Sequence, residues 1–342
     1  MKKSDNKKGW AINMKKVVGN ILYIILLILI FIIGCITLIF KGPSPVASDL
    51  LVTTVMETSA LKFLAKMYFS EEEIERIQYR NSIIDSGEIT DSKFTFENSQ
   101  LDKDEIEIVD IIGPTYKGKL MIINDPSRVE LATLASFEPD SNGKRVEDFV
   151  KETNAVAGIN AGGFEDVNGV GKGGYPLGLV IKDGQIIHET EDRVDTLIGF
   201  DKNNKLIVGR MSGKKALELG VKDAIAFGPV FIVNGKAQKS SGFSGGINPR
   251  TVIGQRKDGA VLFLVIDGRQ SHSIGATYED CIDVMLEYGA YTAANLDGGS
   301  SSIMVYNNEI VNKCASLYGS RRMPTAFIVK SLKVEENVWR SI

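Results

Sequence analysis

An uncharged apolar run at residues 21–40 constrains this chain more than any other feature of its sequence. A helix rises about 1.5 Å per residue, so a run of roughly 20 residues crosses a hydrocarbon core of about 30 Å. The run therefore predicts one transmembrane helix near the N-terminus. We expect a single-pass protein of the cell membrane.

The charges that precede the run predict its orientation. Only Asp5 opposes six lysines there, Lys2, Lys3, Lys7, Lys8, Lys15 and Lys16. Positive flanks stay in the cytoplasm, so the residues after the run are expected on the extracellular side. The alternative is a cleaved signal peptide with a loose cleavage site at residues 45–48, but its apolar core would span only about 7 to 15 residues. The longer run favours an uncleaved anchor.

Composition limits the classes of function. The 342 residues carry 40 Lys and Arg against 43 Asp and Glu, a net charge of −3, which excludes nucleic-acid binding by bulk positive charge. A hydrophobic content of 44% is typical of a folded protein. With 3 Cys and 2 His, zinc sites built from these ligands are not expected. Cys35 lies in the apolar run, and the sequence leaves open whether Cys281 and Cys314 pair.

Sequence patterns divide the chain into a basic cytoplasmic tail (1–20), the membrane helix (21–40), a helical stalk with a polar linker (41–104), a main domain (105–332) and a C-terminal tail (333–342). In the stalk, residues 49–68 have helical spacing, and Ser70 with Glu73 predicts a capping box that opens a second helix. In the main domain short β-rich runs alternate with turn signals, and helical patterns occur at 145–152, 212–219 and 277–288. The predicted fold class is α+β, with a mixed, largely antiparallel sheet and a few packed helices.

Four segments of the main domain combine glycines with polar residues: 158–164, 248–251, 262–269 and 295–302. Glycine-rich loops at strand ends are common ligand sites. Two of these segments end an apolar strand in Asp-Gly, at Asp267 and Asp297. Two carboxylates that face one cavity can divide acid and base work, because each raises the pKa of the other. Each segment alone is equally well explained by a packing turn or a surface arginine.

Three further motifs have the wrong context for the function they suggest. Ser244 lies in a G-x-S-x-G pattern, but a nucleophile elbow needs a strand before the serine and a helix after it, so a serine hydrolase is disfavoured. The glycines at 169–174 do not follow a strand as a dinucleotide fingerprint does. Residues 166–169 carry oxygen ligands of a calcium-loop type, but no Glu follows at the required spacing.

Taken in order over residues 119–329, the motifs resemble the phosphodiester glycosidase family. The resemblance rests on residues 158–164, Leu177-Gly178, Gly228-Pro229, Arg250-Thr251, Asp267-Gly268, residues 295–300 and Arg321-Arg322 through Thr325. The anchor and stalk are similar to those of bacterial members of the exopolysaccharide-biosynthesis type. The resemblance implies a hydrolase that cleaves a sugar-1-phosphodiester at the anomeric carbon, releasing the sugar and a phosphomonoester, and that acts on a cell-envelope or exopolysaccharide glycan.

This resemblance and the residue chemistry together assign the expected site. Asp267 and Asp297 are the expected catalytic carboxylates, with their individual roles left open. A guanidinium binds phosphate through paired hydrogen bonds, so Arg250 and Arg322 are the expected clamp, with Arg269 as a further candidate. The other expected substrate-binding residues are Asn160, Gly162, Gly163, Thr251, Gly268, Gly298, Gly299 and Ser300.

No metal ligand or cofactor is expected, although the sequence leaves a divalent cation open. The expected partners are a sugar-phosphate substrate and, through the N-terminal helix, the membrane. The rival interpretation is a non-catalytic module that binds anionic envelope polymers with the same arginines. Retention of two strand-end carboxylates favours the enzyme, because acidic residues weaken the binding of an anion unless chemistry needs them. The sugar, the anomer, the natural polymer, protein partners and the oligomeric state are left open.

Overall fold

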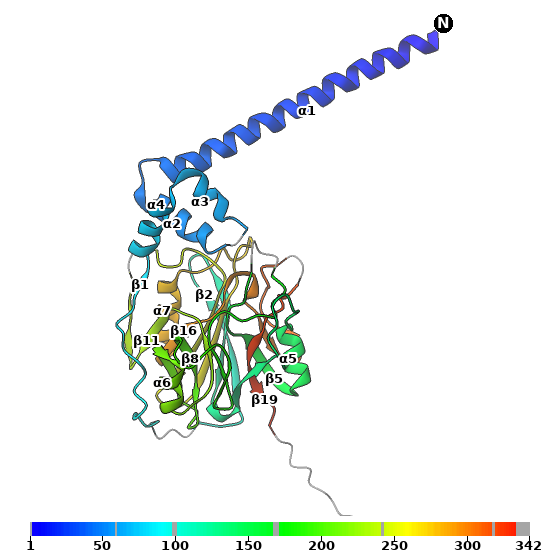
Figure 1. Ribbon diagram of the computed structural model, residues 1–342. Helices are drawn as coiled ribbons and strands as arrows, with labels where there is room; N and C mark the ends of the chain where they lie inside the picture. Colours follow the sequence, from blue (N-terminus) through cyan, green and yellow to red (C-terminus); the bar gives the residue numbers. More distant parts are fainter. Residues whose placement is uncertain are drawn as a thin grey trace, which may run out of the picture.

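The computed structural model describes residues 2–58, 60–97, 101–166, 171–240, 243–316 and 319–332. It has a long N-terminal helix, a small cluster of helices below it and a large β-rich domain (Figure 1). The C-terminal tail expected at residues 333–342 lies outside the described residues.

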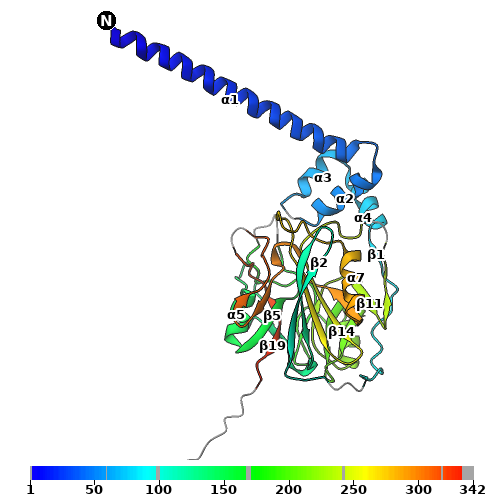
Figure 2. The ribbon, with the colours of Figure 1, turned by 180° about the vertical axis from the view of Figure 1, so that it is seen from behind.

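The N-terminal helix α1 (Lys2–Lys41) projects away from the rest of the chain (Figures 1 and 2). Within it, Lys16–Lys41 is long and apolar enough to cross a membrane, and its apolar side chains from Ile21 to Ile33 are exposed. The expected span at 21–40 is therefore helical, and the basic residues before it continue the same helix.

The stalk consists of α2 (Pro45–Met56), α3 (Lys62–Tyr68) and α4 (Glu71–Arg80). Ser70 and Glu73 form the predicted capping box at the start of α4. The last turn of α1 joins this cluster, because its Phe40 is buried with side chains of all three helices, Val52, Val55, Ala65, Ile74 and Ile77. The pattern at 49–68 is interrupted by a turn that begins at Glu57, and this turn reaches the main domain.

The predicted linker is attached along the surface of the domain. Its strand β1 (Ile83–Ile84) pairs with β13 (Lys239–Ser240). Further along, Thr90 exchanges hydrogen bonds with Val208, one of them from the Val208 amide to Thr90 Oγ1 at 2.9 Å. The stalk is thus fixed to the domain on both sides.

The main domain contains three larger sheets. The seven-stranded sheet has the order β12 (Lys236–Ala237), β11 (Val230–Val233), β16 (Ala290–Asn295), β14 (Arg250–Arg256), β15 (Val261–Ile266), β3 (Lys117–Ile123) and β2 (Ile106–Ile112). One five-stranded sheet has the order β7 (Gln185–His188), β6 (Val180–Lys182), β10 (Val221–Ala226), β8 (Val194–Asp201) and β9 (Leu206–Ser212). The other has the order β18 (Glu309–Ile310), β17 (Met304–Tyr306), β5 (Ala155–Asn160), β19 (Thr325–Lys330) and β4 (Val129–Thr133).

The predicted α+β class is confirmed, and the sheet arrangement is more uniform than expected. Every strand pair among the described residues is antiparallel, and the strands form several sheets where one mixed sheet was expected. The helices α5 (Val146–Glu152), α6 (Gly213–Glu218) and α7 (Tyr278–Glu287) lie where their periodicity predicts them. Strand β15 is wholly buried, which explains its continuous apolar sequence, and the neighbouring β14 is buried up to its last residue, Arg256.

Two strands from different sheets end side by side and thereby position the site. β5 ends at Asn160 and β16 ends at Asn295, and the Asp297 amide donates to the carbonyl of Ala161 at 3.0 Å. β14, which neighbours β16, begins at the same place, since the Leu296 amide donates to the Thr251 carbonyl at 2.8 Å. Three of the four predicted glycine and polar segments therefore meet at one point.

Candidate active site

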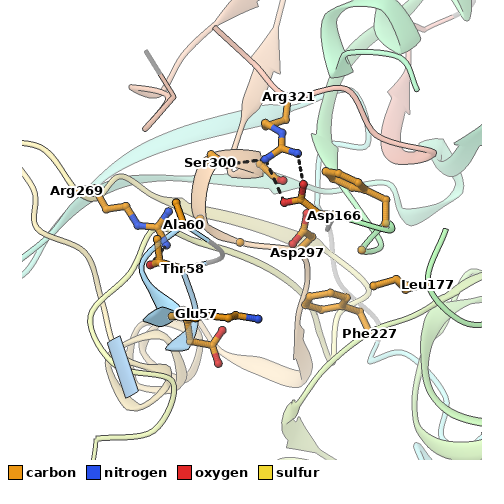
Figure 3. A pocket seen from close by; sticks show the side chains of 16 residues that line it. Glu57, Thr58, Ala60, Asp166, Leu177, Phe227, Arg269, Asp297, Ser300 and Arg321 are labelled. Carbon is orange, nitrogen blue, oxygen red and sulfur yellow. Dashed lines mark hydrogen bonds and ion pairs between the residues drawn. The ribbon is translucent and has the colours of Figure 1, made fainter. Parts of the chain in front are cut away.

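A cavity of about 390 Å³ lies where the stalk meets this junction (Figure 3). The stalk contributes Glu57, Thr58, Ala60 and Lys62. The domain contributes the loop after β5, the loop after β16, and residues that come from other strands and turns: Gly163, Phe164, Asp166, Leu177, Phe227, Arg269, Asp297, Gly298, Gly299, Ser300, Ser301 and Arg321. The cavity therefore has one wall from the stalk and one from the β domain.

Asp297 is the carboxylate that the loop after β16 presents to the cavity. Its backbone is fixed on both sides, because its amide bonds to Ala161 and its carbonyl accepts from Asn160 Nδ2 at 2.5 Å. Burial raises the pKa of Asp297 to about 6, although hydrogen bonds from Ser301 and Gly298 and the charge of Arg321 act in the opposite direction. A carboxylate with such a pKa is suited to proton transfer or nucleophilic attack near neutral pH.

Asn160 and Thr251 hold this loop from behind the cavity wall. Both are fully buried, and Thr251 Oγ1 donates to Asn160 Oδ1 at 2.8 Å. The same oxygen of Asn160 accepts from the Ile303 amide at 3.1 Å. Neither side chain lines the cavity, and both help to fix Asp297 in place, so their expected contact with substrate stays a prediction.

Arg269 is a partly exposed cation on the stalk side of the cavity (Figure 3). Its Nη2 donates to two neutral oxygens, Thr58 Oγ1 at 2.7 Å and Asn248 Oδ1 at 2.9 Å, and no carboxylate among the described residues forms an ion pair with it. Burial and the neighbouring charge of Arg250 lower the pKa of Arg269 to about 10. A guanidinium that faces a cavity without forming an ion pair to a carboxylate is suited to bind an anionic ligand.

The backbone at Arg269 has a positive φ of 58°, a conformation that costs free energy in a residue other than glycine. Gly299, with a φ of 63°, lies against the guanidinium, and a Cβ there would come within 3.3 Å of Nη1. The second glycine of the Asp-Gly-Gly sequence thus leaves space for the arginine.

Asp166 and Arg321 form an ion pair on the opposite side of the cavity, as Figure 3 shows. Arg321 Nη2 lies 3.0 Å from Asp166 Oδ1, and its guanidinium lies over the Phe164 ring at 5.0 Å. Arg321 Nη1 also donates to Ser300 Oγ at 3.5 Å. The sequence pattern around Asp166 predicts only a loop, and Arg322 was the expected clamp residue in place of Arg321, so neither member of this pair was predicted as a site residue.

The two arginines of the predicted clamp do not line the cavity. The Arg250 guanidinium is buried behind it, where it donates to the carbonyls of Gly245, Gly246 and Ala276 and stacks on the Tyr278 ring at 4.3 Å. Arg322 donates instead to the Gly143 carbonyl at 3.1 Å. Of the three candidate arginines, only Arg269 reaches the cavity.

The structure also separates Asp267 from Asp297. The Asp267 carboxylate accepts from the Lys313 amide at 2.8 Å, from Asn312 Nδ2 at 3.1 Å and from His272 Nε2 at 3.0 Å, and it does not line the cavity. Because three donors already satisfy it, Asp267 has the environment of a structural anchor for the 312–313 segment. Its expected catalytic role stays a prediction.

The expected glycines divide between the cavity and its support. Gly163, Gly298, Gly299 and Ser300 line the cavity, whereas Gly162 donates its amide to Thr325 Oγ1 and Gly268 packs against Pro249. No group of three or more His, Cys, Asp or Glu residues placed to hold a metal occurs in the described part of the chain. The expected lack of a cofactor stays a prediction as well.

The serine-hydrolase motif is not assembled as a triad. Ser244 Oγ lies 2.7 Å from Ser240 Oγ, and the histidine that follows it in the sequence, His272, bonds to Asp267. Residue 242 of the motif and residues 167–169 of the calcium-like loop lie outside the described residues. Cys281 and Cys314 belong to different apolar clusters and are unpaired.

Comparison with known proteins places these features in a family. The model of the phosphodiester glycosidase family matches residues 153–330. A curated relative, the SPbeta prophage-derived uncharacterized protein YomE of Bacillus subtilis (strain 168), is 24% identical over 288 residues, which cover 78% of this chain but only 42% of the relative. The chain thus spans less than half the length of this curated relative.

The chain is similar to two solved structures, and the first of them shares its fold. The catalytic domain of zebrafish N-acetylglucosamine-1-phosphodiester alpha-N-acetylglucosaminidase, auto-inhibited by its pro-peptide, is 20% identical with a TM-score of 0.54, over 71% of this chain and 87% of that one. A structure from Burkholderia pseudomallei is 17% identical with a TM-score of 0.47, over 63% and 74% of the two chains. Since the family match covers more than half of the chain, this protein belongs to the phosphodiester glycosidase family.

Proposed function

We propose that this protein hydrolyses a sugar-1-phosphodiester at the anomeric carbon and that Asp297 is its reacting carboxylate. Family membership supports a hydrolase of the glycosidase type. The observation that carries the finer proposal is the pairing, across one cavity, of an arginine that forms no ion pair with a carboxylate in the described residues and a carboxylate whose pKa is raised to about 6. The arginine is suited to bind the phosphodiester, and the carboxylate is suited to react at the sugar carbon next to it.

Arg269 holds the phosphate in this proposal. A phosphodiester carries one negative charge, and a planar guanidinium binds two of its oxygens at once. The charge of the ligand offsets the repulsion between Arg269 and the neighbouring Arg250. Lys62, which also lines the cavity, is a second source of positive charge.

Asp297 then acts as an ionised carboxylate. A phosphate leaves as a weak base, so the reaction needs little general-acid help and depends more on stabilising positive charge at the sugar carbon. Asp297 either attacks that carbon or takes a proton from the attacking water. Asp166 is held in the same cavity by Arg321 and contributes further negative charge near the reacting carbon.

A binding module for anionic envelope polymers is the second candidate, because Arg269 and Lys62 would bind such polymers without turnover. The ionised form of Asp297 disfavours it, since a buried carboxylate repels an anion in the same cavity. We further propose that α1 anchors the chain in the cell membrane with the domain outside, where the substrate is an envelope or exopolysaccharide glycan. The six lysines that precede the apolar run support this orientation.

The test uses the full chain in detergent with a soluble sugar-1-phosphodiester in heavy-oxygen water. Attack at the anomeric carbon puts the label in the released sugar and leaves the phosphomonoester unlabelled. Asp297→Asn should lose most turnover and still bind a substrate analogue, whereas the exposed Asp110→Asn serves as a matched control. Label in the phosphate would overturn the glycosidase mechanism. Binding without turnover in the unmodified protein would favour the binding module.

A further inference from the structure

The short helix α3 exposes apolar side chains that nothing in the described chain covers. Leu61, Phe63 and Met67 are 40%, 56% and 71% exposed, while Ala65 on the other face is fully buried in the stalk core. We propose that α3 lies in the headgroup region of the bilayer that α1 spans, with Phe63 and Met67 inserted into the boundary of the hydrocarbon. This proposal rests on the membrane anchoring proposed above.

The depth of α3 follows from its contacts with α1. Tyr68 Oη lies 2.8 Å from Thr37 Oγ1, and the Tyr68 ring stacks on Phe40 with centroids 4.8 Å apart. Both α1 residues belong to the last turn of the apolar run, which ends at Phe40. A bilayer that covers this run therefore has its surface at the level of Tyr68, and Figure 1 shows α3 beside the lower end of α1.

The residues around the apolar side chains match such an interface. Tyrosine and other aromatic rings concentrate at the boundary between headgroups and hydrocarbon, and lysines extend their charge toward the water. Lys41 lies 3.9 Å from the centre of the Phe69 ring, at the same end of α3 as Tyr68. Lys62 and Lys66 lie four residues apart beside Phe63 and Met67.

Apolar burial, and not attraction to anionic lipid, should hold α3 at the surface. Three glutamates, Glu71, Glu72 and Glu73, follow α3 directly at the start of α4. They offset the positive charge of α3, and Lys66 already pairs with Glu71 at 3.1 Å. Insertion of uncharged side chains is insensitive to salt, whereas binding through lysines weakens as salt screens it.

This placement has a consequence for the cavity. Lys62 is the first residue of α3 and also lines the cavity, and α3 is about 10 Å long at 1.5 Å per residue. The phosphodiester site is thus within about one short helix of the membrane surface. We infer that its substrate is a glycan phosphodiester attached to the membrane.

The experiment measures the depth of α3 in the full chain reconstituted in phosphatidylcholine vesicles. The native Trp10 and Trp339 are replaced by Phe, and Phe63→Trp supplies the probe. The control probe is Leu332→Trp, an exposed apolar residue just after β19, where the chain leaves the domain far from α1 (Figure 1). Lipids that carry a quencher near the headgroup end of the acyl chain report the depth, and flotation of the vesicles reports anchoring.

We expect the Phe63→Trp fluorescence to be quenched at least about 3-fold more than that of Leu332→Trp, in low and in high salt alike. Equal quenching of the two probes in a chain that floats with the vesicles would overturn the interfacial position of α3 and leave the anchoring intact. Quenching that disappears in high salt would overturn apolar insertion. A chain that does not float would overturn the proposed anchoring and this inference with it. None of these results depends on turnover, so they are independent of the proposed reaction.

Discussion

At the scale of single residues, Asp297 links stability to pH. Its pKa in the fold, about 6, lies above the ordinary value of 3.8 for an aspartate, so the folded state favours the protonated form. This favourable contribution is fully present below pH 3.8 and is lost as the pH rises through about 6. One pKa unit corresponds to about 1.4 kcal/mol, so the ionised carboxylate lowers the free energy of unfolding at pH 8 by up to about 3 kcal/mol.

We therefore predict that Asp297→Asn raises the melting temperature at pH 8, and that this gain shrinks as the pH falls from 6 to 4. Thermal unfolding at several pH values checks it, with Asp110→Asn as the exposed control. The activity of the unmodified protein should fall about tenfold per pH unit below 6, because the reacting carboxylate is then protonated. A variant that is less stable than the unmodified protein at pH 8 would show that the carboxylate is stabilised by contacts that outweigh its burial.

Arg269 and Arg322 provide a matched pair for the phosphate clamp. Arg269→Lys keeps a positive charge but loses the planar fork, so kcat/KM on a phosphodiester should fall about 10- to 100-fold. Arg322→Lys should change it less than about 2-fold, because this side chain bonds to the Gly143 carbonyl away from the cavity. Steady-state kinetics checks both, with melting temperatures to exclude unfolding. Equal losses of kcat/KM in the two variants would show that Arg269 does not bind the phosphate through its planar guanidinium.

At the scale of elements, Asn160 connects three strands from two sheets. Its side chain bonds to the Asp297 carbonyl, to Thr251 Oγ1 on β14 and to the Ile303 amide before β17. Asn160→Ala leaves these buried groups without partners, at a cost of about 2 to 4 kcal/mol in unfolding free energy, and also lowers kcat by displacing Asp297. Denaturant unfolding and kinetics measure the two effects.

Thr292→Val on β16 is the control, because the buried Thr292 Oγ1 has no hydrogen-bond partner in the described residues. Removing an unpaired hydroxyl should be neutral or stabilising. If Asn160→Ala is as stable and as active as Thr292→Val, the Asn160 connection does not position the site.

Local sequence patterns predicted most of the helices and strands. They did not predict the direction in which individual side chains point. The strands at 106–112 and 325–330 and the capping box at Ser70 follow from periodicity and end signals alone. Which of two neighbouring arginines faces the cavity depends on register. In extended chain, successive side chains point to opposite sides, so Arg321 reaches the cavity while Arg322 turns away next to the bridge between Lys144 and Met323.

The same alternation explains Arg250. It is adjacent to Thr251 on β14, and Thr251 faces Asn160, so Arg250 points to the other face, toward Tyr278 on α7. The stalk residues Glu57 and Thr58 could not be assigned to the site from sequence at all. Their place there depends on contacts between segments about 190 residues apart, such as Ile247 with Thr54.

At the scale of the whole molecule, the stalk joins the membrane helix and the cavity into one unit. Phe40 of α1 is buried in the stalk core, and the stalk turn bonds to Arg269 through Thr58. In the anchored arrangement proposed above, the cavity therefore keeps a fixed height above the bilayer. A substrate in the same bilayer meets the site at a high effective concentration, whereas a soluble substrate gains nothing from this geometry.

The final prediction follows from that height. In proteoliposomes, Phe63→Glu and Met67→Glu together should lower turnover of a vesicle-anchored sugar-1-phosphodiester about 3- to 10-fold, because charged side chains at the boundary tilt the stalk away from the lipid. Turnover of the soluble substrate should stay unchanged, because neither side chain lines the cavity. Leu332→Glu, with a similarly exposed apolar residue, is the control. A parallel fall on both substrates would trace the loss to the fold of the stalk, and no fall on either would show that the height of the cavity is set by α1 alone.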